Sequence, residues 1–408
     1  MKKKGLYKKA VDGIFDAWKD IRRHPHKETI GVDGESIESF SSNAIRNIKQ
    51  IRAELRTGSF HFQQLRPHII KENGKKDREI LIFTVRDRVV SRSILEVIKP
   101  KFAKYYSGSD YSIKRHKKNA RSSRYNGVPL IAELIQRSLR DGFYWVFETD
   151  IKSFFDSIPK EDILKIISHE INDKALFSLI QEIVNFQVKR EKNVSINNDK
   201  DIEGIAQGSS ISPLLASLYL YKFDIAISNI PDVRLIRYVD DLIILCKTRG
   251  VADKVYIFVQ EELAKLGLSI YKLNETSPSG KIKTRILNSR DSREGHFIFL
   301  GLSFNYCDID IPQGKKVEFV EEVKSLLFEH HGNFLEKKKR VENKFAGFTS
   351  QYSHPHYRTR DSLFSLRRKV DSLLEDYFIA NIRDILGYSF FKKLTKGQIK
   401  RLLLFFGG

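Results

Sequence analysis

The sequence predicts an α+β fold in which antiparallel hairpins pack against helices. Residues 237–245 form an apolar, strand-forming run that carries two acids at the tip of an expected hairpin. Residues 146–150 form a second strand that leads out of the interior and ends at an acid. From residue 315 onward the apolar spacing becomes helical. At 408 residues the chain can bury a large core and should divide into subdomains.

The amino-terminal part is predicted to be helical, with one hairpin. Helices are expected at residues 6–23 and 41–56, on either side of a glycine turn at 31–34. Residues 66–82 then contain two strand-like runs around the Asn-Gly pair at 73–74, a dipeptide typical of tight hairpin turns.

The remaining elements alternate between strands and helices before the chain becomes wholly helical. A helix is expected at residues 213–227, and another ends at Gly267 and is followed by a strand. The carboxy-terminal helices are predicted at 317–330, 333–350, 359–386 and 396–405. Val341, Phe345 and Phe348 fall on one helical stripe, which favours core packing.

Three acids are candidates for a metal site. Asp240 and Asp241 are adjacent carboxylates in an apolar run, which is costly unless a cation neutralises them, and carboxylates are good ligands for divalent metals. The pair alone fits an ordinary hairpin turn equally well, because Asp is common in turns. Asp150, at the end of its strand, could also be a turn or a helix cap, although Asp162 after Pro159 is the better cap.

The composition indicates an anionic polymer as partner. Lys and Arg number 72 against 51 acids, which gives a net charge of +21 and a pI near 9.7. A basic surface that served solubility alone would not need clusters, but here the charge is clustered at residues 2–4, 8–9, 114–118 and 337–340. Such clusters bind phosphate without reading sequence, and their binding weakens with salt.

Other classes of protein are disfavoured by the sequence. No apolar run approaches the length of a membrane span, and no signal-peptide core follows the first residues, so we expect a cytoplasmic protein without a membrane partner. Cys246 and Cys307 are too few for a zinc site and are expected to be reduced.

Four segments together resemble the reverse transcriptases, in particular the bacterial group related to group II introns, retrons and defence-associated enzymes. Residues 150–158 resemble the first catalytic motif of that family, and residues 204–216 resemble the second. Residues 238–241 (Tyr-Val-Asp-Asp) resemble the third, and residues 299–302 the later primer-grip motif. All four occur in family order.

The resemblance implies a right-hand polymerase fold and an RNA-directed DNA polymerase that adds dNTPs to a 3′ hydroxyl. The fingers would comprise residues 1–95 and 159–205, the palm residues 96–158 and 206–308, and the helical thumb residues 309–408. Two Mg²⁺ ions are implied, with Mn²⁺ as an alternative. Asp150 and Asp240 would hold them together with Ile151, and Asp241 would support them.

The resemblance also implies residues that bind the nucleotide. Phe155 would be a steric gate against a 2′ hydroxyl, although a core aromatic is the plain alternative. Gln207 would lie near the incoming nucleotide, and Lys71 and Arg78 would meet its triphosphate. A solvated basic hairpin is the alternative for the last two. No general acid is assigned, because residues 277–283 interrupt the segment in which the family carries a lysine.

Two groups of basic residues are candidates for contact with nucleic acid. Arg86 and Arg88 would contact the template or form structural ion pairs. Four consecutive cations on the exposed side of a thumb helix would follow the minor groove of the duplex. These are Lys337, Lys338, Lys339 and Arg340.

The biological role is expected from what the chain lacks. No zinc endonuclease, RNase H or protease motif follows residue 405, and the retron markers (His at its place after Asn119-Ala120, and a Val-Thr-Gly) are missing. We therefore expect a stand-alone antiphage-defence reverse transcriptase that copies a dedicated noncoding RNA from a DNA or RNA primer. A partner protein or a homo-oligomer stays open. The alternatives are a retron-type or group II intron-derived enzyme, and a catalytically idle RNA-binding scaffold.

Overall fold

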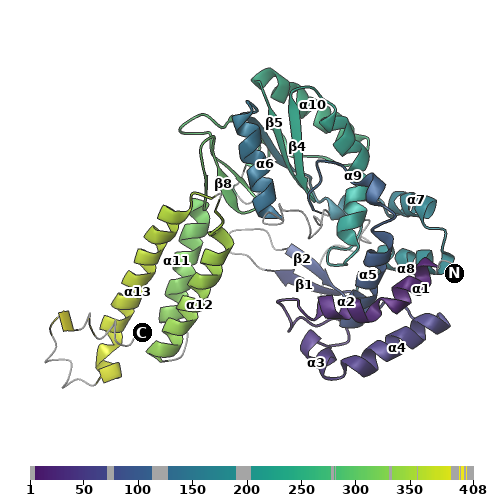
Figure 1. Cartoon of the computed structure of the whole chain (residues 1–408), viewed down its shortest axis with the longest axis horizontal. Coiled ribbons are helices and arrows are strands. Elements are labelled where there is room, and N and C mark those ends of the chain that lie inside the picture. Colours follow the sequence, from purple (N-terminus) through teal and green to yellow (C-terminus); the bar gives the residue numbers. More distant parts are fainter. Residues whose placement is uncertain are drawn as a thin grey trace. The chain divides into compact units, whose positions relative to one another are not determined.

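The computed structural model combines antiparallel sheets with helices, which confirms the α+β class (Figure 1). It describes residues 5–70, 78–112, 127–189, 204–276, 280, 282–329, 333–355, 357–386, 395, 397–398 and 401. The chain divides into two compact units. The first contains residues 1–123 and 145–287, and the second contains residues 124–144 and 288–408.

The first unit begins with helices that pack on one another. They are α1 (Leu6–Asp12), α2 (Ile14–Ile21), α3 (Ile37–Ser42), α4 (Ala44–Thr57) and α5 (Val85–Ile98). The single helix expected over residues 6–23 is broken at Gly13. A β-carbon there would meet Ser93 Oγ at 2.9 Å, so glycine lets the chain pass close to α5, on which α1 and α2 pack.

The expected amino-terminal hairpin is present. Strands β1 (Arg66–Ile70) and β2 (Arg78–Ile82) pair antiparallel, with Arg66 opposite Ile82 and Ile70 opposite Arg78. Lys71 and the Asn-Gly pair at 73–74 lie outside the described residues. The glycine turn at 31–34 is also present. Gly31 packs against Thr84, and Gly34 has a φ of 73°.

A four-stranded sheet in the order β4-β5-β3-β6 forms the centre of the first unit. Its strands are β3 (Trp145–Asp150), β4 (Val233–Tyr238), β5 (Asp241–Cys246) and β6 (Arg285–Asn288). Strand β5 lies between β4 and β3, and its residues 242–246 are fully buried, including Cys246. Helix α9 (Ser212–Ser228) contacts β4, and α10 (Arg249–Ala264) contacts β3 and β5.

Shorter elements complete the first unit. The 3₁₀ turns η1 (Ala103–Tyr105) and η2 (Phe155–Ser157) and the helices α7 (Lys160–Glu170) and α8 (Lys174–Val184) connect the longer elements. The helix expected to end at Gly267 is α10, and Gly267 follows it with a φ of 69°. The strand expected next is reduced to a bridge between Ile151 and Ile270.

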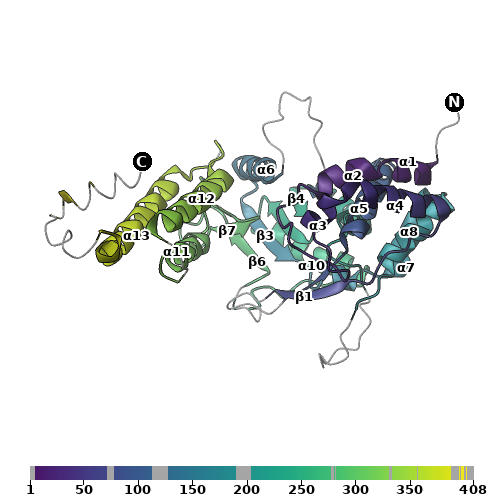
Figure 2. The ribbon, with the colours of Figure 1, turned by 90° about the horizontal axis from the view of Figure 1, so that it is seen from below.

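The second unit is a small sheet joined to long helices. It contains α6 (Val128–Arg140), β7 (Phe297–Phe299), β8 (Leu302–Phe304), β9 (Ile309–Asp310), α11 (Gln313–Phe328), α12 (Phe334–Tyr352) and α13 (Arg360–Leu386). The last three helices lie side by side (Figures 1 and 2). Val341 is buried between them, with Phe345 and Phe348 packed against the same core, as the helical stripe predicts.

Two further expectations meet the structure in the second unit. Most of the helix expected at 396–405 lies outside the described residues. Cys307, between β8 and β9, is exposed and free, and so is no part of a disulfide.

None of the helices in the described part of the chain is long and apolar enough to cross a lipid bilayer.

Candidate active site

The three candidate acids come together at one end of the central sheet. Asp150 is the last residue of β3, and its antiparallel partner is Asp241, the first residue of β5. Directly opposed residues in such a pair place their side chains on the same face. Val239 and Asp240 form the two-residue turn between β4 and β5, and the Ile151 amide donates to the Asp240 carbonyl at 3.4 Å. The predicted hairpin therefore exists and places Asp240 beside the other two acids.

The turn has an unusual backbone at Val239, where φ is +60°. This left-handed conformation is uncommon for a β-branched residue and costs on the order of 1–3 kcal/mol. Such a conformation persists only where the surroundings hold it. Here the Arg237 Nη1 donates to the Val239 carbonyl at 2.9 Å.

The electrostatics of the cluster disfavour three negative charges. Desolvation by surrounding atoms, followed by the nearby carboxylates of Asp240 and Asp150, raises the pKa of Asp241 to about 6, although its side chain still reaches solvent. Like charges at close range oppose ionisation of one another. A cation beside the cluster would relieve this repulsion.

Lys283 supplies one such cation. Its Nζ donates to Asp150 Oδ2, and the side chains are 38% and 20% exposed. Burial lowers the pKa of Lys283, but the hydrogen bond and charge of Asp150 outweigh this and the pKa is raised overall. Asp150 Oδ1 is buried and has no hydrogen-bond partner among the described residues.

Lys283 belongs to an alternating set of contacts between β3 and the chain at β6. Arg285 Nε donates to Glu148 Oε2 at 2.8 Å, and each partner of this pair lies two residues from its counterpart in the Asp150–Lys283 pair. Between them, the hydroxyls of Thr149 and Thr284 are hydrogen-bonded at 2.8 Å. The alternation of Lys, Thr and Arg at 283–285 mirrors the period of two in a strand and was the sequence signal that could have identified Lys283.

The acids suit a magnesium ion by their chemistry. Among the described residues, no three His, Cys, Asp or Glu side chains are grouped so that they alone would hold a metal. Magnesium is commonly held by one or two carboxylates together with water and substrate phosphates. The unpartnered Asp150 Oδ1 and the raised pKa of Asp241 mark oxygens that such an ion would satisfy.

Phe155 lies against the segment that contains Gln207. A β-carbon at Gly204 would lie 2.0 Å from the Phe155 carbonyl oxygen, so only glycine lets the two backbones approach this closely. Gly208 has a φ of +109° and passes within reach of the Leu81 carbonyl of β2. Phe155 is half-buried and packs against the core, as the core-aromatic alternative predicts. Its role as a steric gate stays a prediction.

The basic candidates have different surroundings. Arg78 begins β2, and Lys71 lies outside the described residues. Arg86 Nη2 forms an ion pair with Glu54, which is the structural role expected as the alternative to template contact. Arg88 donates to the carbonyls of Phe83 (2.9 Å) and Thr29 (3.2 Å). Contact of either arginine with a template stays a prediction.

The prediction that Lys337 lies on the exposed side of its helix is wrong. Only 5% of Lys337 is exposed, its Nζ donates to the Leu327 carbonyl at 2.6 Å, and it lies over the Tyr377 ring. Lys337 falls on the stripe of Phe334 and Val341, and its aliphatic stem packs there. Lys339 and Arg340 are exposed and Lys338 is half-buried.

A buried ionic network beneath the hairpin was not predicted from the sequence. Arg237 is 0% exposed and donates to Asp224 through Nε (2.7 Å) and Nη2 (2.5 Å). Its Nη2 also donates to Asp110 Oδ2 at 3.0 Å. Asp110 lies far from Arg237 along the chain and Asp224 lies on α9, so no local sequence pattern reveals these partners.

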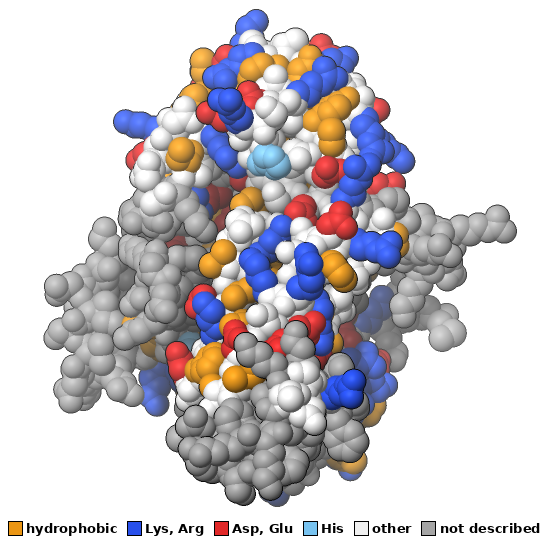
Figure 3. Space-filling view, turned by 90° about the vertical axis from the view of Figure 1, so that its left-hand side faces the viewer, with side chains coloured by type: hydrophobic (Ala, Val, Ile, Leu, Met, Phe, Trp, Pro, Cys, Tyr) orange, Lys and Arg blue, Asp and Glu red, His pale blue; other side chains and the backbone are white. Residues whose placement is uncertain are grey.

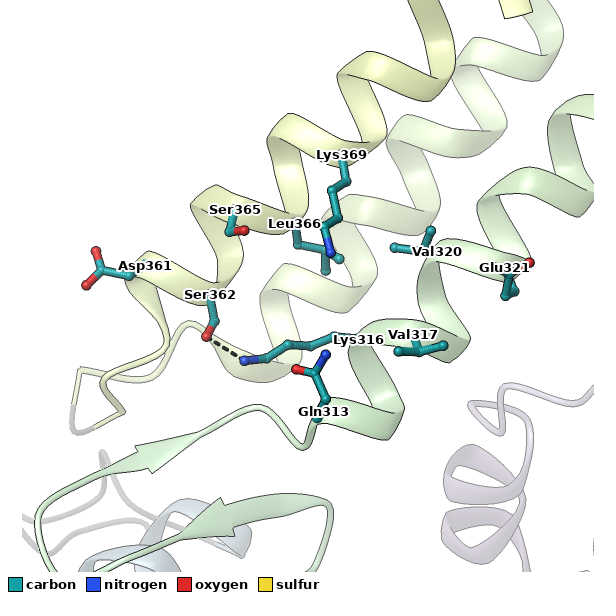
Figure 4. Close-up of a pocket in the computed structure, with 10 residues that line it drawn as sticks. All are labelled: Gln313, Lys316, Val317, Val320, Glu321, Asp361, Ser362, Ser365, Leu366 and Lys369. Carbon is teal, nitrogen blue, oxygen red and sulfur yellow. Dashed lines mark hydrogen bonds between the residues drawn. The ribbon is translucent and has the colours of Figure 1, made fainter. Parts of the chain in front are cut away.

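A separate pocket of about 490 Å³ lies in the second unit, between α11 and α13 (Figure 4). Lys316 and Lys369 extend into it, and Lys316 Nζ donates to Ser362 Oγ at 2.7 Å and to Asp310 Oδ2 at 2.9 Å. The acids of the first unit do not line it. On the face shown in Figure 3, Lys and Arg side chains are intermixed with Asp and Glu.

The family profile described as reverse transcriptase (RNA-dependent DNA polymerase) matches residues 69–274, just over half of the chain. The chain belongs to the reverse transcriptase family. The matched region contains both Asp150 and the Asp240–Asp241 pair.

Curated relatives of this reverse transcriptase include bacterial and intron-encoded proteins. It is 26% identical over 200 residues to protein YkfC of Escherichia coli, covering 48% of this chain and 49% of YkfC. It is 24% identical over 214 residues to the group II intron-encoded protein LtrA of Lactococcus lactis, covering 52% of this chain and 33% of LtrA. A 91 kDa protein in the cob intron of Schizosaccharomyces pombe is 25% identical over 230 residues, covering 56% of this chain and 26% of that protein. The chain thus spans about a quarter to a half of these relatives.

Among solved structures, a partial Cas6-RT-Cas1--Cas2 complex aligns with 64% of this reverse transcriptase and 42% of that chain. The sequence identity is 20% and the TM-score is 0.36. The fold class of the family is the right-hand polymerase fold, and the antiparallel sheet backed by α9 and α10 agrees with its palm.

Proposed function

We propose that this reverse transcriptase is an RNA-directed DNA polymerase that adds dNTPs to a 3′ hydroxyl. The observation that carries the proposal is the pairing of Asp150 with Asp241 across β3 and β5, with Asp240 in the adjoining turn. An idle scaffold would have no need to gather three carboxylates at one sheet end, where desolvation and the neighbouring carboxylates raise the pKa of Asp241.

Asp150, Asp240 and the Ile151 backbone would hold two Mg²⁺ ions, or Mn²⁺ in their place, and Asp241 would support them. When bound, two such ions stabilise the attacking and leaving oxygens of a phosphoryl transfer. The role of the chain is to present oxygen ligands from a rigid sheet. Lys283 donates to Asp150 Oδ2, so Oδ1 is the oxygen of Asp150 that would coordinate an ion.

Nucleotide recognition is assigned to the residues around Gly204 and Gly208. Phe155 would lie beneath the sugar and exclude a 2′ hydroxyl, and Gln207 would contact the nucleotide. Lys71 and Arg78 of the β1–β2 hairpin would meet the triphosphate, Arg as a fork of donors and Lys as a point charge. The support is that Gly204 packs against Phe155, and Gly208 against β2.

The subdomain bounds predicted from the sequence are kept in this proposal. Fingers would comprise 1–95 and 159–205, palm 96–158 and 206–308, and thumb 309–408. On the thumb, Lys338, Lys339 and Arg340 would contact the template–primer duplex, and Arg86 and Arg88 would support the fingers while lying near the template. The net charge of +21 supports a polyanionic partner.

The biological proposal is a cytoplasmic defence enzyme that copies a dedicated noncoding RNA. The likeness to LtrA and to other intron proteins supports an origin in the group II intron lineage. It equally favours the second candidate, an intron-derived or retron-type enzyme in another context. Sequencing of the RNA and DNA that copurify with the protein separates defence from an intron-derived enzyme: one abundant noncoding RNA with matching cDNA supports defence, and intron RNA supports the intron-derived enzyme.

The Asp240→Ala/Asp241→Ala variant tests the polymerase proposal. Extension of an RNA-templated primer should fall by at least about 1,000-fold, because the ligands of both ions are weakened. Binding of template–primer and the melting temperature should stay near wild type. The matched control replaces two acids of α10 whose side chains reach solvent, half-buried Asp253 and exposed Glu261, as Asp253→Ala/Glu261→Ala, and should retain activity. Wild-type extension by the Asp240→Ala/Asp241→Ala variant would refute the mechanism.

A further inference from the structure

The buried side chain of Arg237 joins the strained turn that carries Asp240 to the interior of the first unit. Arg237 is two residues before Val239, and its Nη1 donates to the Val239 carbonyl at 2.9 Å. Val239 itself adopts a φ of +60°, which its branched side chain disfavours. The hydrogen bond therefore joins the least favourable backbone position of the hairpin to a group that is fully buried.

The remaining donors of Arg237 fix its guanidinium in place. Asp224 on α9 accepts from Nε and Nη2, and Asp110 accepts from Nη2. Ser107 Oγ donates to Asp224 at 2.7 Å, and Ser217 Oγ donates to Asp110. Three separate parts of the first unit thus converge on one guanidinium.

The backbone at Arg237 is held as well. Its amide donates to the Ser109 carbonyl at 2.9 Å, and its carbonyl accepts from the Tyr111 amide at 3.0 Å. Burial disfavours the charged guanidinium, but Asp224 and Asp110 reverse that effect and raise the pKa of Arg237. The side chain is therefore a fixed, charged donor aimed at the turn.

Stability alone is a poor explanation for this network. A buried ion pair loses so much hydration that apolar residues of similar volume often stabilise a protein as well or better. What apolar residues could not supply is a donor for the Val239 carbonyl. A lysine has one nitrogen and lacks the planar fork of arginine, so it could not bond Asp224 through two nitrogens and also donate to the Val239 carbonyl.

We propose that Arg237 is a positioning residue, which holds the Val239–Asp240 turn so that the Asp240 carboxylate is directed towards Asp150. The expected effect of Arg237 on kinetics rests on the proposed polymerase function. The expected effect on the order of the turn does not. Outer-shell groups that orient ligands change metal affinity or activity by about 10- to 100-fold when removed. We expect a change of that size here.

The test compares Arg237→Lys with Arg234→Lys, the same substitution on the same strand. Hydrogen exchange of the amides of residues 239–241 should be about tenfold faster in Arg237→Lys than in wild type. The Mn²⁺ concentration that half-saturates the protein, measured by Mn²⁺ magnetic resonance, should be about tenfold higher. In primer extension, kcat should fall and the half-saturating Mg²⁺ concentration should rise, with the KM for dNTP unchanged. Arg234→Lys should match wild type in all of these.

Each outcome decides the matter. Wild-type exchange and metal dependence in a folded Arg237→Lys protein would overturn the proposal, since a purely structural role would lower only the melting temperature. If Arg237→Lys does not fold, Arg237→Gln/Asp224→Asn removes one buried charge of each sign and should loosen the turn in the same way. Failure of both to fold would assign the network to folding and overturn the proposal. If the wild type does not extend primers, the polymerase function fails, and exchange and Mn²⁺ binding still test the positioning role.

Discussion

The two carboxylate oxygens of Asp150 have different surroundings, and the difference bears on metal binding. Oδ2 accepts from Lys283, whereas Oδ1 is buried without a partner in the described part of the chain. An unsatisfied buried oxygen is costly, so its persistence needs a reason. A cation at Oδ1 would supply the missing partner and would compete with Lys283 for the same carboxylate.

Replacing this lysine should therefore strengthen metal binding. We expect Lys283→Met to bind Mn²⁺ several-fold more tightly in the absence of substrate, because the competing ammonium is gone and the repulsion among the acids is unrelieved. Arg285→Met is the matched control, since it removes the neighbouring cation, which pairs with Glu148 and not with Asp150. Titration calorimetry measures both. Weaker binding by Lys283→Met would contradict the competition.

A second prediction at this scale concerns the choice of sugar. Phe155→Ala should raise incorporation of ribonucleotides relative to deoxynucleotides by about tenfold or more, because removing a ring that clashes with a 2′ hydroxyl changes discrimination by more than 1 kcal/mol. Phe154→Ala is the control. This neighbouring ring is 2% exposed, so its loss should lower stability without changing sugar preference. Equal preference in Phe155→Ala and wild type would remove the gate assignment.

At the scale of elements, the close approach of η2 and the segment at 204–210 shapes the nucleotide region. Gly204 touches the backbone of Phe155 and Asp156, and the Ile205 amide donates to the Phe155 carbonyl at 2.9 Å. Both neighbours are backbone, which cannot move aside as a flexible side chain could. The position of Gln207 thus depends on a glycine three residues earlier.

Gly204→Ala should consequently separate the two segments. We expect a loss of several kcal/mol in the free energy of unfolding, or a displaced segment with a strongly raised KM for dNTP, because a methyl group would lie 2.0 Å from the Phe155 oxygen. Gly250→Ala on α10 is the control, since nothing lies within 4 Å of a β-carbon there. Urea unfolding and dNTP titration measure the effects. A Gly204→Ala protein equal to wild type in both would contradict the packing argument.

How far sequence predicts these elements depends on whether their cause is local. The β4–β5 hairpin and α10 with Gly267 are predictable because strand runs, turn residues and the helix-ending glycine are neighbours in the chain. Lys337 was misplaced because four consecutive cations suggested an exposed face, although the spacing to Phe334 and Val341 places it on the apolar stripe. Arg237 could not have been placed, because Asp110 lies 127 positions away.

At the scale of the whole molecule, the buried Asp87 connects stability to pH. Asp87 is 0% exposed, its Oδ2 accepts from the Gln63 amide at 3.1 Å, and its Oδ1 has no partner among the described residues. Burial raises the pKa of Asp87 to about 7. The native state therefore binds this proton more tightly than the unfolded chain does.

The sign of the pH effect follows from that difference. The contribution of Asp87 is fully present below about pH 4, declines as the pH rises, and is lost above about pH 7, in total on the order of a few kcal/mol. In Asp87→Asn this decline should disappear, because the amide does not titrate. Urea unfolding between pH 4 and pH 8 measures it, with exposed Asp16→Asn as control. An unchanged pH profile in Asp87→Asn would show that Asp87 is ionised in the native state.

The two cysteines provide an experimental handle that needs no mutation. Cys246 ends the central strand, is 0% exposed, and burial raises the pKa of its thiol to about 12, so it is unreactive. Cys307 is exposed between β8 and β9 of the second unit. A maleimide dye should therefore attach to the native chain at Cys307 alone. The label would report, by fluorescence, whether the second unit responds to added template–primer and nucleotide.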